Sequence, residues 1–347
     1  MMIRRIQTID AHTAGEPLRL IVSGFPSPDG RTMLEKREWM RRHVDHLRRA
    51  LMLEPRGHAD MYGALLTEPV TKDADAGILF MHNEGYSTMC GHGVIAVVTI
   101  ALERHLLMPR DPGGAILLDS PAGLIRARAN VVGRDRDHGS SAAPDTVANR
   151  VASVSFINVP SFVLQAGLRL KVGGRDLAVD VAFGGAFYAL VDSEAVGVPL
   201  DAAHLPELRQ LGTEIKQQVE SLRKIVHPND PGLTGIYGTI FTAPAQAPDA
   251  DLRQVTIFAD AEVDRSPCGT CTSAAMAVLD AMGLLSDDRP FVPESIIGTR
   301  FEGRVASRTT VGDFPAVVPE ITGSAWVTGE HTFLIDEDDP LSHGFRI

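Results

Sequence analysis

Short apolar runs bounded by Gly, Pro and polar residues alternate along this chain with longer segments that carry apolar residues at helical spacing. The runs of strand type cover residues 6–12, 18–22, 76–81, 151–164, 168–172, 178–191, 254–258, 291–305 and 316–333. The helical segments cover residues 33–53, 94–107, 205–225 and 273–279, and the basic residues of the first are expected on a solvated face. The pattern predicts an α+β protein.

One local order of elements occurs twice. A short apolar strand leads through a polar connection into Cys90-Gly91 and then into a helix. A second strand leads in the same way into Cys268-Gly269 and another helix. We therefore interpret the chain as two related halves, each of which contributes one thiol at the start of a helix.

The composition between these halves indicates where one ends and the other begins. Residues 132–150 are rich in Arg, Asp, Gly, Ser and Ala, as expected of a linker or a surface excursion. We predict a first lobe over residues 1–135 and a second over residues 150–324. Residues 325–347 are expected to pack back on the first lobe, and the acidic, turn-rich residues 336–344 among them are expected to form a surface tail.

A thiol at the start of a helix has a physical rationale. The first helical turn presents unpaired N–H groups and a partial positive charge, which stabilise a thiolate and lower its pKa. The same N–H groups bind a carboxylate, and glycine allows the ligand to approach the backbone. Two such sites facing each other would hold an amino-acid carboxylate between two thiols, of which one removes the Cα proton and the other returns a proton to the opposite face.

Composition and charge narrow the classes of partner. The chain has 347 residues, of which 44% are hydrophobic, so it can bury substantial cores. Its net charge of −11 argues against nucleic acid or an anionic membrane as the main partner. No apolar segment of 18 residues and no secretory signal pattern occurs, and the three cysteines do not form a disulfide framework. We expect a cytoplasmic protein with reduced thiols.

The cysteines also allow other interpretations. Cys268 and Cys271 form a CxxC pair, which is compatible with a non-catalytic amino-acid-binding or redox protein. That interpretation leaves Cys90 unexplained. A zinc site needs four ligands, and an inert buried thiol is the default for either cysteine alone. The repeated Cys-Gly-helix order favours the two-thiol interpretation.

Several polar loop residues are weaker candidates. His12 and Glu16 flank a tight turn, and either a nearby site or local hydrogen bonding would explain them. Four further residues could be considered as metal ligands: His58, Asp60, His82 and His92. Their spacing does not match a zinc site, so they are better explained as loop residues whose side chains are hydrogen-bonded locally. We therefore expect no metal site and no bound cofactor.

Four segments together resemble the proline racemase family, and the resemblance covers nearly the whole chain. The segments are residues 10–17, 54–58, 89–93 and 264–270. The resemblance implies two pseudo-symmetric α/β lobes of the diaminopimelate epimerase type, with the active site between the lobes, no cofactor and usually a homodimer. Family members are proline racemases, hydroxyproline 2-epimerases and trans-3-hydroxy-L-proline dehydratases, so the implied ligand is a small imino acid.

The resemblance also implies roles for individual residues. Cys90 and Cys268 resemble the acid and base pair of the family. The remaining roles are a carboxylate site from the backbones of Gly91, His92, Gly269 and Thr270, a ring-nitrogen site from His92 and Asp264, and a wall around the ring from Tyr62 and Phe258.

The subfamily signals point in two directions. Tyr62 and Ser87 are typical of the enzymes that act on hydroxylated rings, whereas dehydratases usually carry Thr where this chain has Cys268. Because hydrogen-bonding groups would be left unpaired around plain proline, a hydroxyproline is the favoured substrate. We expect a racemase or epimerase, with a dehydratase as the alternative. Cys271 departs from the family pattern, which usually has Gly there.

Overall fold

A computed structural model of the chain describes residues 3–111, 113–133 and 149–346. Most of the predicted linker over residues 132–150 lies outside the described residues. No helix in the described ranges is both long and apolar enough to cross a membrane.

The first part of the chain, up to residue 157, alternates strands and helices. Its strands are β1 (Ile3–Thr13), β2 (Glu16–Ser23), β3 (Tyr62–Thr67), β4 (Ala76–His82), β5 (Tyr86–Ser87), β6 (Ala115–Ser120), β7 (Gly123–Gly133) and β8 (Asn149–Ile157). Its helices are α1 (Met33–His43), α2 (Asp45–Met52) and α3 (Gly91–Glu103).

The second part has a similar order of elements. Its strands are β9 (Ser161–Val172), β10 (Arg175–Phe183), β11 (Phe187–Asp192), β12 (Gly238–Ala243), β13 (Leu252–Phe258), β14 (Glu262–Asp264), β15 (Pro293–Glu294), β16 (Glu302–Val311), β17 (Phe314–Gly323) and β18 (Ala325–Asp336). Its helices are α4 (Ser193–Val196), the short 3₁₀ helix η1 (Ala202–His204), α5 (Leu205–Leu222) and α6 (Gly269–Ala281).

Strand pairing repeats between the two parts. In the first, β2 pairs parallel with β3, β3 antiparallel with β4, and β4 antiparallel with β5 and parallel with β6. In the second, β11, β12, β13, β14 and β15 pair in the same directions and the same order. Helix α3 follows β5 as α6 follows β14, so each half delivers one helix N-terminus to an equivalent position.

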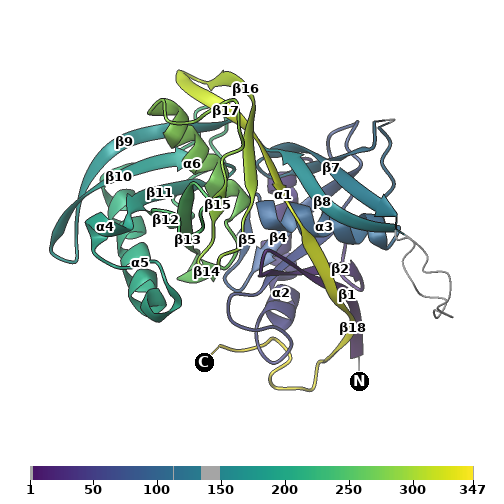
Figure 1. The fold of residues 1–347 in the computed structure, drawn as a ribbon. Helices are drawn as coiled ribbons and strands as arrows, with labels where there is room; N and C mark the ends of the chain where they lie inside the picture. Colours follow the sequence, from purple (N-terminus) through teal and green to yellow (C-terminus); the bar gives the residue numbers. More distant parts are fainter. Residues whose placement is uncertain (1–2, 112, 134–148, 347) are drawn as a thin grey trace.

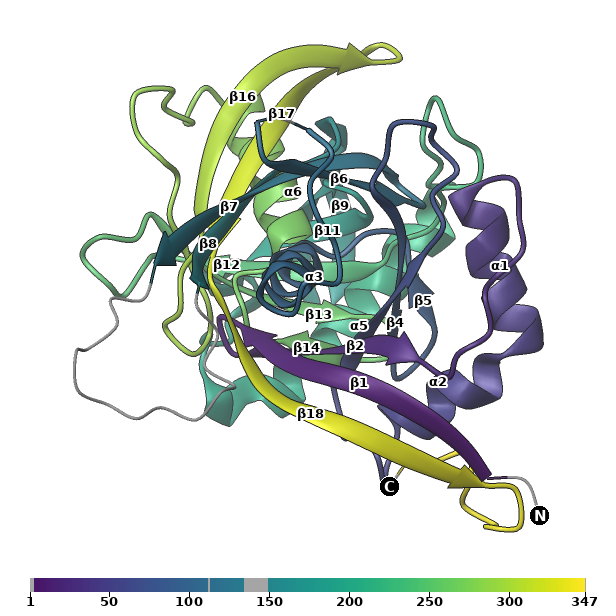
Figure 2. The ribbon, with the colours of Figure 1, turned by 90° about the vertical axis from the view of Figure 1, so that its right-hand side faces the viewer.

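The last strand joins the two halves. β18 leaves the second half after β17 and pairs antiparallel along the whole of β1, which Figure 2 shows as two long strands side by side. β17 also pairs with both β8 and β9. The halves are therefore joined by continuous sheet on one side, as Figure 1 shows for the region around β8, β17 and β18.

Each half has a core that matches the sequence pattern of its central helix. Residues 91–101 of α3 and residues 269–277 of α6 are buried throughout. A helix that is buried on all sides requires cover on all sides, which the curved sheets supply. The apolar runs of β4 and β13, both largely buried, have the same explanation.

The predicted helix over residues 33–53 is wrong in one respect, because it is two helices. The backbone leaves helical geometry at Val44, whose φ is −133°. This break lets Met40, Val44 and Leu47 enter one core cluster. The basic residues are not all solvated either, since buried Arg48 donates through Nη1 to the backbone carbonyl of His82 at 2.7 Å.

The predicted strand over residues 291–305 is also only partly correct. β15 is two residues long, and a turn over residues 295–300 separates it from β16. In that turn Ser295 accepts the backbone N–H of Thr299 at 3.2 Å, and Gly298 has a φ of +80°. Side-chain capping of the turn replaced the strand that the apolar pattern suggested.

The N-termini of α3 and α6 meet at two glycines. A Cβ atom added at Gly91 would lie 2.5 Å from the Cα atom of Gly269. One added at Gly269 would lie 2.8 Å from the Cα atom of Gly91. Only glycine at both positions permits this approach of two backbones.

We predict that Gly91→Ala lowers the free energy of unfolding by about 1–3 kcal/mol, because the added methyl group has to push the two helices apart. The measurement is urea denaturation followed by circular dichroism. Gly85→Ala is the control, since an added Cβ there meets no atom within 4 Å. Because alanine favours helices by about 1 kcal/mol over glycine, an unchanged or raised stability of Gly91→Ala would contradict the steric argument.

Candidate active site

A small cavity lies where the two helix N-termini meet. Its walls come from β3, α3, β11, β13, β14, α6 and the segments next to them. The lining residues are Tyr62, Met89, Cys90, Gly91, His92, Tyr188, Tyr237, Thr256, Phe258, Asp264, Cys268 and Thr270. Both halves of the chain therefore contribute to one site.

Cys90 is the N-cap residue of α3. Its Sγ atom accepts the backbone N–H of Gly93 at 3.3 Å, and it lies 3.2 Å from Nδ1 of His92. The residue is only 5% exposed. The thiol thus occupies the position at which a helix N-terminus stabilises a negative charge.

Cys268 holds the equivalent position on α6 with a different local geometry. Its φ is +56°, a region that residues with a Cβ atom rarely adopt and that is often found at functional sites. The backbone N–H donates to Oγ of Ser266 at 3.0 Å, and Sγ lies 3.4 Å from Oγ1 of Thr270. Unlike Cys90, Cys268 makes no capping hydrogen bond to its own helix.

The electrostatic prediction for the two thiols is wrong in direction. Burial raises the pKa of Cys90 well above its ordinary value, and the charge of Asp264 raises it further. Burial also raises the pKa of Cys268, with Cys271 and Asp264 as further causes. The helix N-terminus opposes these effects, but a single N–H bond at Cys90 does not offset desolvation of a thiolate.

His92 and Asp264 lie together beside the thiols. Nδ1 of His92 is 3.8 Å from the Asp264 carboxylate, and both residues are buried. Burial lowers the pKa of His92, while Asp264 acts in the opposite direction. The carboxylate is held in place by the backbone N–H and the hydroxyl of Ser266, at 2.8 and 2.7 Å.

Of the two candidates at the first turn, Glu16 lies near the site and His12 does not line it. Glu16 is fully buried and accepts the backbone N–H of Arg265 at 2.7 Å. Burial raises the pKa of Glu16, and Asp264 raises it further. His12 instead stacks on Trp326, with ring centroids 5.4 Å apart.

Aromatic side chains form one wall of the cavity. The rings of Tyr62 and Phe258 lie 6.0 Å apart, and Tyr237 stacks on Phe258 at 5.5 Å. The hydroxyl of Tyr62 donates to Oγ of Ser87 at 2.6 Å and lies 3.0 Å from the hydroxyl of Tyr237. Ser87 is therefore behind Tyr62, at the end of a chain of three hydroxyl groups.

Two of the lining tyrosines were missed from the sequence. Tyr188 bonds Thr270 through their hydroxyls at 2.7 Å, and Tyr237 carries one end of the hydroxyl chain. The chain has only four tyrosines, and three of them line this cavity. That scarcity was the available signal, but periodicity could not show that Tyr237 reaches a partner on the other half.

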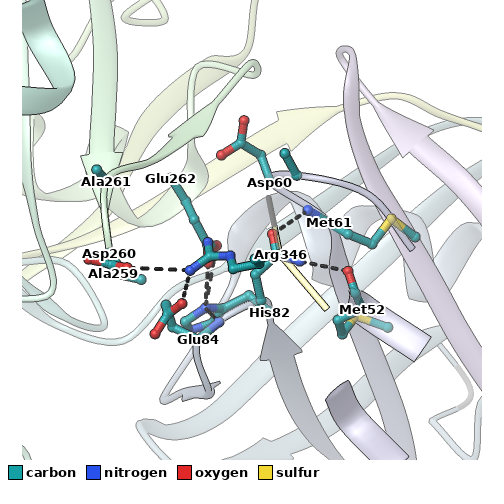
Figure 3. Close-up of polar contacts among 12 residues, drawn as sticks. Met52, Asp60, Met61, His82, Glu84, Ala259, Asp260, Ala261, Glu262 and Arg346 are labelled. Carbon is teal, nitrogen blue, oxygen red and sulfur yellow. Dashed lines mark hydrogen bonds and ion pairs between the residues drawn. The ribbon is translucent and has the colours of Figure 1, made fainter. Parts of the chain in front are cut away.

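The last residues of the chain, after the acidic segment 336–344, contact both halves. Figure 3 shows Arg346 directed between Glu84 of the first half and Asp260 of the second. Arg346 also lies 3.6 Å from Glu262, which is 3.4 Å from Nδ1 of His82. This group of charges ties the two halves together next to the aromatic wall.

The residues weighed as metal ligands are used otherwise. Asp60 pairs with Arg209 at 2.7 Å, and Nδ1 of exposed His58 lies 2.7 Å from the carbonyl oxygen of Ala59. Among the described residues, no three His, Cys, Asp or Glu side chains are grouped as metal ligands would be. Cys271 is fully buried behind the site, where its Sγ accepts the Thr256 hydroxyl at 3.0 Å.

Curated relatives match nearly the whole chain. A trans-3-hydroxy-L-proline dehydratase of Bacillus cereus is 47% identical over 340 residues, which covers 98% of this chain and 97% of the relative. A proline racemase of Clostridioides difficile is 40% identical over 344 residues, covering 99% of this chain and 98% of the relative.

A solved structure agrees with the fold. The hydroxyproline epimerase of Agrobacterium vitis, with bound trans-4-hydroxy-L-proline, superposes with a TM-score of 0.87 at 31% identity. The match covers 99% of this chain and 95% of the epimerase chain. The predicted sheet-rich, two-lobed fold of the diaminopimelate epimerase type is confirmed. The family model for proline racemase matches residues 8–346, and the chain belongs to the proline racemase family.

Proposed function

We propose that the protein is a cofactor-independent racemase or epimerase that inverts Cα of proline or a hydroxyproline. The observation that carries the proposal is that thiols from two equivalent helix N-termini, Cys90 and Cys268, line one cavity. Inversion needs a base on one face of Cα and an acid on the other, and two thiols on opposite halves meet that need.

The proposed step moves two protons and no other atoms. One cysteine, as the thiolate, takes the Cα proton, and the electron pair of the C–H bond passes into the carboxylate to give an enolate-like species. The other cysteine donates its proton to the opposite face of Cα. The thiolate and the thiol have then exchanged places, so the reverse direction uses the same groups.

Backbone donors would stabilise the charge that develops on the carboxylate. The first N–H groups of α3 and α6, at Gly91, His92, Gly269 and Thr270, are directed out of two adjoining helix N-termini. Because they are fixed before the reaction, they cost no reorganisation as the charge moves onto the carboxylate oxygens.

The ring nitrogen is assigned to His92 and Asp264. The carboxylate of Asp264 is close enough to raise the pKa of both thiols. A protonated ring nitrogen beside Asp264 would offset that effect. Substrate binding would therefore favour ionisation of one cysteine at the moment when a base is needed.

The hydroxyl chain favours a hydroxylated ring. Tyr62, Ser87 and Tyr237 bond one another at the aromatic wall, and Phe258 supplies the apolar face against which a ring can stack. These hydroxyls already bond one another, and they can exchange one of those bonds for a bond to a ring hydroxyl, which plain proline lacks.

The alternative is a dehydratase that acts on trans-3-hydroxy-L-proline, and the 47% identical relative of that name favours it. In that reaction Cys90 removes the Cα proton, and Cys268 protonates the 3-hydroxyl group, which leaves as water. The product is a pyrroline carboxylate. This reaction needs one base and one acid, but no second proton delivered to Cα.

We propose two further properties. A homodimer follows from the resemblance to the family, and a cytoplasmic location agrees with three free cysteines in the described structure. The lobe boundaries near residues 135, 150 and 324 also remain predictions, which limited proteolysis would test.

Proton NMR in D₂O tests the reaction directly. With L-proline, trans-4-hydroxy-L-proline and trans-3-hydroxy-L-proline in separate tubes, we expect deuterium at Cα and the inverted isomer, with a hydroxylated ring preferred. Loss of the 3-hydroxyl group with formation of a pyrroline carboxylate would identify the dehydratase. No change in any tube would reject both activities.

Replacement of Cys268 by Ser separates the two reactions. Because a hydroxyl is a much weaker acid than a thiol, we expect inversion to fall by about 10²–10⁴-fold. Cys271→Ser is the matched control, since it lies on the same turn of α6 and does not line the cavity. Inversion retained in Cys268→Ser would reject the two-thiol mechanism, and retained dehydration would support the alternative.

The pH dependence of alkylation tests the raised pKa of the thiols. A thiolate is the reactive species, so the rate at Cys90 and Cys268 with iodoacetamide should still be rising above pH 9 in the free protein. The reference is the alkylation rate of N-acetylcysteine, whose thiol has an ordinary pKa of about 8.5. A rate that levels off below pH 8 would show lowered pKa values instead.

A further inference from the structure

A second cleft lies against the back of the aromatic wall. It separates α1 of the first half from α5 of the second. The residues that matter for its chemistry are Arg37, Ser87, Thr88, Lys216, Glu220 and Tyr237. No role has been assigned to this cleft in the reaction described above.

The wall between the cleft and the cavity is thin. Tyr237 lines both spaces, and Ser87, which lines the cleft, accepts the hydroxyl of Tyr62, which lines the cavity. Tyr62 and Tyr237 belong to different halves, so their 3.0 Å contact crosses between them. The hydroxyl of Thr88 makes a second crossing bond, to the carbonyl of Gly185 at 2.8 Å.

These crossing bonds join neutral groups. A hydrogen bond between uncharged partners contributes about 0.5–1.5 kcal/mol net, so breaking the contact between Tyr62 and Tyr237 to move the Tyr237 side chain is a small cost. The sheet pairing of β17 with β8 holds the halves together elsewhere. Displacement of the Tyr237 side chain would connect the cleft to the cavity.

The cleft contains two cations, Arg37 and Lys216, neither of which forms an ion pair with a described carboxylate. Arg37 is half-buried and makes no hydrogen bond or ion pair with any described residue. Its neighbour Glu38 pairs instead with Arg41 and Arg42. A guanidinium that is partly desolvated without a partner is costly, which indicates a ligand that is anionic.

Lys216 faces the same space from α5. Its Nζ atom donates to the carbonyl of Ala259 at 3.1 Å, and no carboxylate of the described chain lies within ion-pair distance. Glu220 is the acidic residue that lines the cleft, and its Oε1 atom accepts the backbone N–H of Ile236 at 2.8 Å. In a protein of net charge −11, a cleft with an excess of positive charge is a local exception.

We infer that this cleft is the entrance to the active site, and that Arg37 and Lys216 form a docking site for the carboxylate of the incoming substrate. The inference rests on the proposed function, because that function supplies an anionic carboxylate as the ligand. The two cations bind the carboxylate of the zwitterionic substrate before its ring passes Tyr237, and they take no part in proton transfer.

Anionic and neutral alkylating reagents of similar size test the docking site. Iodoacetate carries a carboxylate and iodoacetamide does not, and both form a carbon–sulfur bond with loss of iodide. We measure the rates at Cys90 and Cys268 by mass spectrometry and take the iodoacetate to iodoacetamide ratio. Arg37→Gln and Lys216→Gln should each lower that ratio about three- to tenfold, and the double variant should lower it further.

Matched controls remove the same charge outside the cleft. Arg42→Gln lies on the same helix as Arg37, and Lys224→Gln lies just after α5, where it is exposed. Neither should change the ratio. Raising the salt concentration should lower the ratio for the wild type and have little effect on the double variant, because salt screens exposed charges over about 10 Å at 0.1 M.

Equal ratios in the cleft variants and in the controls would overturn the inference. Failure of both reagents to alkylate either thiol even above pH 9, where thiolates form, would also overturn it, since each reagent is smaller than the ring that has to enter. Alkylation needs no turnover, so this result is independent of the NMR test of the proposed function. For an active enzyme, kcat/KM should fall in the cleft variants while kcat is retained.

Discussion

The close contact between Gly91 and Gly269 is the constraint on which the rest of the site depends. It brings two helix N-termini from equivalent positions of the two halves within backbone contact. The thiols of Cys90 and Cys268 and the first N–H groups of both helices consequently line one cavity. Sheet pairing through β17 and β18 supports this contact from one side, and the ion pairs of Arg346 support it from the rim.

Two electrostatic effects of opposite sign compete in this arrangement. The helix N-termini favour negative charge, whereas burial of the thiols and the nearby carboxylate of Asp264 disfavour it. In the free protein burial dominates, and it raises the pKa of both cysteines. A bound zwitterionic imino acid would change both electrostatic effects on the thiols. Its carboxylate would bind at the helix N-termini, and its charged ring nitrogen would lie beside Asp264. The site is thus suited to becoming reactive with a substrate present.

The aromatic wall would affect both the binding of the substrate ring and the passage of substrate from the cleft into the cavity. Tyr62, Tyr237 and Phe258 pack on one another and line the cavity, and the two tyrosines also share a hydrogen bond between the halves. The same wall that would contact a substrate ring therefore separates the cavity from the cleft of Arg37 and Lys216. Movement of the halves would alter recognition and access together.

By itself the sequence determined the α+β class, the repeated strand, Cys-Gly turn and helix, and the family, because these depend on local periodicity and on short motifs such as the segment from Cys268 to Thr270. It did not show the break at Val44 or the turn before β16, where packing and side-chain capping outweighed the apolar pattern. Only the tertiary structure decided the direction of the thiol pKa shifts and the part that Tyr237 has in the wall. Both depend on burial and on contacts between residues far apart in the chain, which no local pattern records.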